Sequence, residues 1–87
     1  MKTFESLWQE LDERIQSADS SSNTVQLINL GVHAIGKKIM EEAGEVWLAS
    51  EYQTNDELAT EIAQLIYHLQ VIAKARGITL TEIYEKL

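Results

Sequence analysis

The sequence predicts an all-α protein, and three observations support this fold class. The 87 residues include no proline, a residue that interrupts helices. Apolar residues recur three and four positions apart along most of the chain, which is the spacing of amphipathic helices. Capping patterns, in which Thr or Asn is followed three residues later by Glu or Gln, precede several apolar runs. The length indicates one small domain, residues 1–87.

The first helix is predicted over residues 3–16. Its apolar side chains share one face: Phe4, Leu7, Trp8, Leu11 and Ile15. Residues 17–22 contain only Ser, Ala and Asp, and this composition predicts a loop.

A second helix is predicted over residues 23–52, with a bend near Gly31 or Gly36. Asn23 and Gln26 resemble the capping box that would begin it. One apolar stripe follows its length: Val32, Ile35, Ile39, Ala43 and Val46.

A third helix is predicted from the capping box of Thr54 and Glu57 to a point near Arg76, where Gly77 suits the position after the helix. Its predicted apolar face consists of Leu58, Ile62, Leu65, Leu69 and Ile72. A further capping box, Thr79 with Glu82, predicts a short last helix.

The charge of the chain is concentrated in one segment. Residues 41–61 hold seven of the fourteen acids, and no Lys or Arg occurs from residue 39 to residue 73. A net charge of −7 argues against binding to nucleic acid, where Lys and Arg must replace counterions. The sequence lacks the apolar core of a signal peptide and any run long enough to span a membrane. We therefore expect a cytoplasmic protein with no membrane or nucleic-acid partner.

The spacing of the acids predicts a metal site. Glu42 and Glu45 lie beside the apolar stripe of the second helix, and Glu61 and Gln64 lie along the edge of the third. If these helices pack antiparallel, the two acidic edges meet across a cleft. The simpler interpretation is a solvated surface, but the acids have few bases one turn away to pair with them. A hard cation, Mg²⁺ or alternatively Mn²⁺, would offset the repulsion.

Two motifs in this region resemble a known family. They are Lys37-Lys38-x-x-Glu41-Glu42-x-x-Glu45 and Glu61-x-x-Gln64-Leu65-x-Tyr67-His68-Leu69. They are similar to those of phosphoribosyl-ATP pyrophosphatases, which belong to the all-α, MazG-like nucleoside triphosphate pyrophosphohydrolases. The resemblance extends over about residues 4–87. One position departs from it, because Gln64 stands where the family motif has Asp, and its carbonyl brings no charge to a cation.

The resemblance implies a reaction, the hydrolysis of phosphoribosyl-ATP to phosphoribosyl-AMP and pyrophosphate in the second step of histidine biosynthesis. It implies Glu42, Glu45 and Glu61 as metal ligands, with Gln64 as a weaker one. Glu41 would orient a ligand, bind a second ion or accept a proton.

The remaining candidate residues would bind the substrate. Lys37 and Lys38 would hold phosphate oxygens, although pairing with Glu41 and Glu42 at i, i+4 is the simpler interpretation. Tyr67, His68 and Thr24 are further candidate substrate contacts by resemblance. A surface role without substrate contact is equally consistent with His68.

The resemblance also implies a MazG-like bundle of two long antiparallel helices, completed by dimerisation. Apolar positions on a second face of the third helix agree with a homodimer: Ile66, Val71 and Ala75. The next enzyme of the pathway is a possible functional partner.

Three alternatives stay open on the sequence alone. The first is a related enzyme that hydrolyses dUTP, dCTP or damaged nucleotides. The second is a non-catalytic acidic helical adaptor. A di-iron bundle is the third, but Gln64 stands where its Glu-x-x-His motif needs His.

Overall fold

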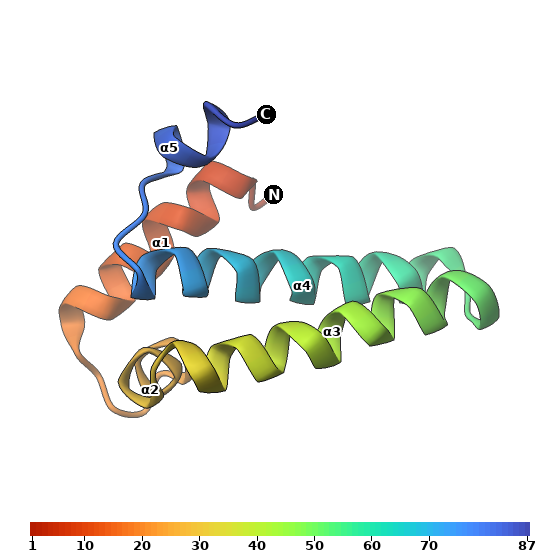
Figure 1. The fold of residues 1–87 in the computed structure, drawn as a ribbon, viewed down its shortest axis with the longest axis horizontal. Helices are drawn as coiled ribbons and strands as arrows, with labels where there is room; N and C mark the ends of the chain where they lie inside the picture. Colours follow the sequence, from red (N-terminus) through yellow and green to blue (C-terminus); the bar gives the residue numbers. More distant parts are fainter.

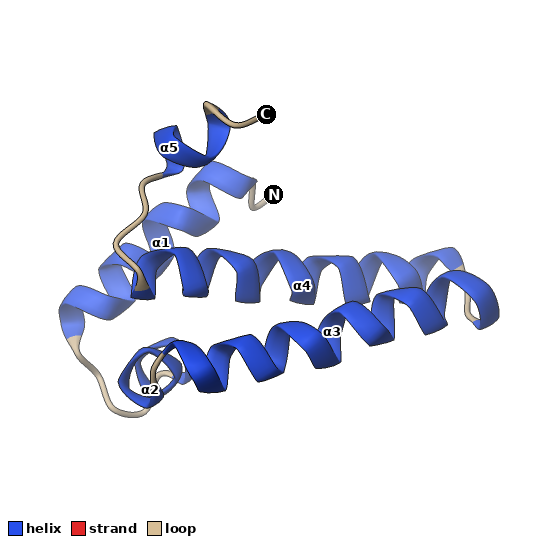
Figure 2. Cartoon of the chain, in the orientation of Figure 1, coloured by secondary structure: helices blue, strands red, loops and turns tan.

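The computed structural model describes residues 1–87 and confirms the all-α class, with five helices and no strand. The helices are α1 (Phe4–Ser17), α2 (Asn23–Leu30), α3 (Val32–Tyr52), α4 (Asn55–Ala75) and α5 (Leu80–Tyr84). Figure 1 shows α3 and α4 as a long antiparallel hairpin, with α1 and α2 against one end of it. Figure 2, coloured by secondary structure, shows a chain that is helical apart from short connections and its ends. None of the five helices combines the length and apolar character that crossing a bilayer requires.

The helix starts follow local capping chemistry. Thr54 with Glu57 and Thr79 with Glu82 form the predicted capping boxes, in which the Thr side chain accepts from the third helical amide. The capping box predicted at Asn23 is wrong. Ser22 caps α2 by accepting from the backbone N–H of Val25, because its hydroxyl precedes the helix while Asn23 is already helical.

Gly31 separates α2 from α3, so the single helix predicted over residues 23–52 is two helices. Gly31 has φ +96° and ψ 175°, a conformation outside the helical region that a side chain would disfavour. Gly36 lies inside α3 and marks no boundary. At the same end of the hairpin, where α4 finishes, Gly77 has φ +70° and ends α4 as predicted.

The core lies where α1 and α2 cover the hairpin. Four apolar side chains from different helices form it: Leu11, Leu27, Ile35 and Val71. Ile35 and Val71 are fully buried. Since only 10 of the 87 residues are buried, stability depends strongly on these few contacts.

Replacing Ile35 with Ala should therefore lower the free energy of unfolding by about 2–5 kcal/mol. Ile35→Val removes one methylene and should lower it by only about 0.5–1.5 kcal/mol. Urea unfolding followed by circular dichroism measures both values. Equal, small effects of the two substitutions would contradict the placement of Ile35 at the centre of the core.

The apolar stripes predicted for the long helices are only partly correct. Ile35 and Ile39 face the core, but Ile62 and Leu69 are 42% and 45% exposed. Val71 and Ala75, predicted to face a second subunit, instead pack inside this chain. The reason is tertiary, because α1 and α2 cover one end of the hairpin and leave the rest of its surface open (Figure 1).

Candidate active site

Three carboxylates converge midway along the hairpin. Glu42 and Glu45 project from α3, and Glu61 projects from the facing turn of α4. One oxygen atom of each lies within 4.8 Å of the others, so a single ion could contact all three. The antiparallel packing of α3 and α4 therefore brings these acids together as the sequence analysis predicts.

The electrostatics of this carboxylate cluster (Glu42, Glu45 and Glu61) are unfavourable without a cation. The pKa of Glu61 is raised above its usual value, first by a hydrogen bond shared with Glu45, then by burial and by the charges of Glu45 and Glu42. Glu42 Oε2 is buried and has no hydrogen-bond partner. An orphaned carboxylate oxygen beside two more acids fits a hard divalent cation, which binds oxygen ligands.

Lys38 lies beside the carboxylate cluster but does not neutralise it. Its Nζ lies 3.4 Å from Glu41 Oε2, an i, i+3 pair in which both side chains are more than half exposed. The i, i+4 pairings expected for Lys37 and Lys38 are absent. Lys37 instead lines a shallow groove on another face of α3, beside Val32 and Met40.

Gln64, predicted as a fourth ligand, lies one turn beyond Glu61 on α4 and is exposed. Successive residues turn by about 100°, so Gln64 lies about 60° around the helix from Glu61, and Tyr67 about 60° further in the same direction. Gln64 also lines the neighbouring pocket. It therefore stands between the carboxylate cluster and that pocket.

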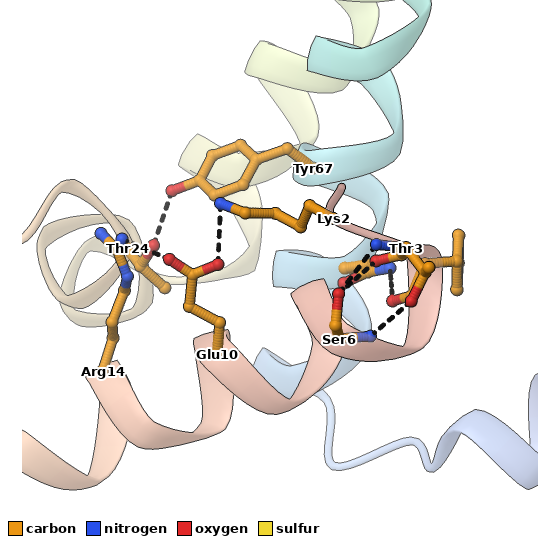
Figure 3. A network of polar contacts seen from close by, with 9 residues as sticks. Lys2, Thr3, Ser6, Glu10, Arg14, Thr24 and Tyr67 are labelled. Carbon is orange, nitrogen blue, oxygen red and sulfur yellow. Dashed lines mark hydrogen bonds and ion pairs between the residues drawn. The ribbon is translucent and has the colours of Figure 1, made fainter.

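The neighbouring pocket, of about 430 Å³, lies between α1, the start of α2 and the middle of α4. It brings together two residues predicted as substrate contacts, since the Thr24 and Tyr67 hydroxyls are 2.7 Å apart (Figure 3). Asn23 Nδ2 donates to the Tyr67 hydroxyl across 3.3 Å. Thr24 is only 1% exposed, so this pairing anchors α2 to α4.

The three charged residues of the pocket were not predicted from the sequence as functional: Lys2, Glu10 and Arg14. Glu10 accepts from Lys2 and from Arg14 at 2.8 and 2.7 Å. The only sequence pattern that pointed to this group is the i, i+4 spacing of Glu10 and Arg14, which is common on helix surfaces.

His68 is buried rather than placed on the helix surface, with 6% of the residue exposed. Its Nδ1 lies 2.8 Å from the Gln64 carbonyl, and its ring packs edge-on against Tyr67. The ring therefore supports Tyr67 from behind, while contact with substrate stays a prediction.

A comparison with protein families identifies the reaction class. The model of the phosphoribosyl-ATP pyrophosphohydrolase family matches residues 4–87. The chain belongs to this family. Members are phosphoribosyl-ATP diphosphatases, hydrolases that cleave a phosphoanhydride bond in histidine biosynthesis, and the family has the MazG-like all-α fold.

Proposed function

We propose that this member of the family hydrolyses phosphoribosyl-ATP to phosphoribosyl-AMP and pyrophosphate with Mg²⁺ as its cofactor, or Mn²⁺ in its place. The observation that carries the proposal is the carboxylate cluster with its unpartnered, buried Glu42 oxygen. Three carboxylates held together without a cation would repel one another and destabilise the fold. They make a good set of oxygen ligands for a hard cation.

In this proposal Glu42, Glu45 and Glu61 hold the ion, and Gln64 contributes a neutral oxygen directly or through water. When bound, the ion supplies charge neutralisation for phosphate oxygens and helps orient the attacking water. Glu41 is next to the cluster but outside it, so it is available to accept the proton of that water.

The basic and hydroxyl-bearing residues divide between two places. Lys38 lies next to the acids and would hold oxygens of the triphosphate, and Lys37 would do so from the adjacent face. Thr24 and Tyr67 would contact a sugar of the substrate from the neighbouring pocket. His68 would keep Tyr67 in place.

We further propose that residues 1–87 form one domain that acts as a homodimer. Met40 and Trp47 are 79% and 67% exposed on α3. They point away from Ile35 and Val46, because their positions lie about 100–140° further around the helix. Large apolar side chains exposed in this way mark an interaction surface. A functional link with the next enzyme of the pathway is consistent with this arrangement.

The test is an assay of the purified protein with phosphoribosyl-ATP, ATP, dUTP and dCTP, with products separated by anion-exchange chromatography. Phosphoribosyl-ATP should give pyrophosphate with Mg²⁺, and EDTA should abolish the reaction. We expect kcat/KM for phosphoribosyl-ATP to exceed that for each free nucleotide by about tenfold or more. Equal or faster hydrolysis of the free nucleotides would replace this proposal with a general nucleotide pyrophosphatase.

A further inference from the structure

The neighbouring pocket carries a local excess of positive charge in a chain whose net charge is −7. Lys2 and Arg14 share the single carboxylate of Glu10, through its two oxygens. By contrast, Lys74 and Lys38 each pair with an acid of their own. Two cations on one carboxylate leave one positive charge unbalanced at the wall of the pocket.

The two cations are positioned but accessible. The side chains of Lys2 and Arg14 are 58% and 49% exposed, so a ligand in the pocket can reach them. The pKa of Glu10 is lowered by hydrogen bonds from Lys2 and Arg14, and the resulting carboxylate holds both side chains at the same place. Figure 3 shows this group next to Thr24 and Tyr67.

Neutral hydrogen-bonding groups complete the pocket. The Tyr67 hydroxyl lies within hydrogen-bonding distance of both the Thr24 hydroxyl and the Asn23 side-chain amide. Basic side chains suit a phosphate, and hydroxyl and amide groups suit the hydroxyls of a sugar. The lining therefore matches a phosphorylated sugar better than a planar base.

The pocket begins where the carboxylate cluster ends. Gln64 lies between them around the helix, and Glu61 and Tyr67 are separated by about 9 Å along the axis of α4. A substrate with its triphosphate at the cluster can thus extend past Gln64 into the pocket. Phosphoribosyl-ATP has such a shape, because a second phosphate group lies on its added ribose, far from the triphosphate.

We propose that Lys2 and Arg14 bind the phosphate of the phosphoribosyl arm, with Glu10 as the residue that positions them. This inference rests on the proposed function. It makes the pocket a determinant of specificity, since free nucleoside triphosphates lack that phosphate and gain nothing from the two cations.

The test compares Arg14→Gln and Lys2→Gln with Arg76→Gln, an exposed position at the end of α4 that removes the same charge. Ribose 5-phosphate probes the arm, and pyrophosphate probes the triphosphate site, both as inhibitors of phosphoribosyl-ATP hydrolysis. Each pocket variant should raise KM for phosphoribosyl-ATP and the inhibition constant of ribose 5-phosphate about tenfold or more, because a charge-assisted hydrogen bond is lost. The kcat and the inhibition constant of pyrophosphate should stay within about twofold. Arg76→Gln should change none of these values.

Two results would overturn the inference. A parallel rise in the inhibition constant of pyrophosphate would assign the cations to the triphosphate, and unchanged constants in both folded variants would make the group purely structural. Circular dichroism establishes that each variant is folded. If the unaltered protein fails to cleave phosphoribosyl-ATP, the proposed function itself is wrong, and direct binding of ribose 5-phosphate, measured by calorimetry, still tests the pocket.

Discussion

Glu61→Gln should reduce the turnover of phosphoribosyl-ATP by about 100-fold or more while raising the melting temperature of the metal-free protein. A bound cation contributes several kcal/mol to stabilising charge during phosphoryl transfer. Losing one of three carboxylate ligands weakens that contribution. The opposite effect on stability arises because Gln removes a charge that Glu42 and Glu45 repel. Steady-state kinetics and thermal unfolding in EDTA measure the two effects.

The raised pKa of Glu61 also predicts how the stability of the metal-free protein changes with pH. The pKa of Glu61 is raised in the folded chain above its ordinary value of 4.5, so between the two values the folded state binds more protons than the unfolded state. The free energy of unfolding of the metal-free protein therefore falls as pH rises through that window. Glu61→Gln should remove this decline. Metal binding should show the reverse trend and weaken as pH falls, because protons compete for the same oxygens.

Glu13→Gln is the matched control. Glu13 is an exposed residue of α1, and this substitution removes one negative charge, as Glu61→Gln does. It should leave turnover unchanged and preserve the rise in melting temperature on addition of Mg²⁺ or Mn²⁺. Glu61→Gln should shrink that rise, because stabilisation by a ligand scales with its affinity. Full turnover in Glu61→Gln, or an equal metal-dependent shift, would show that the three acids are a solvated surface.

The parts of the structure that the sequence could predict depend on local chemistry. Thr54 and Glu57 define a helix start within four residues, and Gly77 defines a helix end through its own φ. The carboxylate cluster was also predictable, because the spacing of Glu42 and Glu45 places both near one edge of a helix, and α4 is the only other long helix that could face them.

The neighbouring pocket could not be predicted because it depends on how α1 crosses the hairpin. Lys2 and Glu10 are eight residues apart, and nothing in the local pattern indicates that Lys2 and Arg14 share Glu10. The buried face of α4 could not be predicted for the same reason. Periodicity identified Ile62 and Leu69 as apolar but could not show that α1 and α2 would cover Val71 instead.

The exposed apolar side chains of α3 form a surface on which a second copy of the chain could pack. Two large apolar residues, Met40 and Trp47, are flanked by the small residues Gly36, Ala43 and Gly44, each of which lies within about 60° of both around the helix. A helix whose apolar surface extends beyond the stripe that packs inside its own chain is normally buried on that wider surface as well. Small residues between large ones also let another helix approach closely. The inner face packs on α4 in this chain, so the outer face is suited to a second copy.

Trp47→Asp should convert the proposed homodimer into a folded monomer with strongly reduced activity. A charge at the centre of an apolar contact must be desolvated there, whereas in the monomer it stays in water. Size-exclusion chromatography with light scattering measures the mass, and circular dichroism verifies the helices. Leu87→Asp, at a position that is 97% exposed at the end of the chain, is the control and should leave the dimer intact. On dilution of the unaltered protein, indole emission should shift to longer wavelength as Trp47 returns to water. A monomeric mass for the unaltered protein, at concentrations where it is fully active, would contradict the homodimer and require one chain to form the complete site.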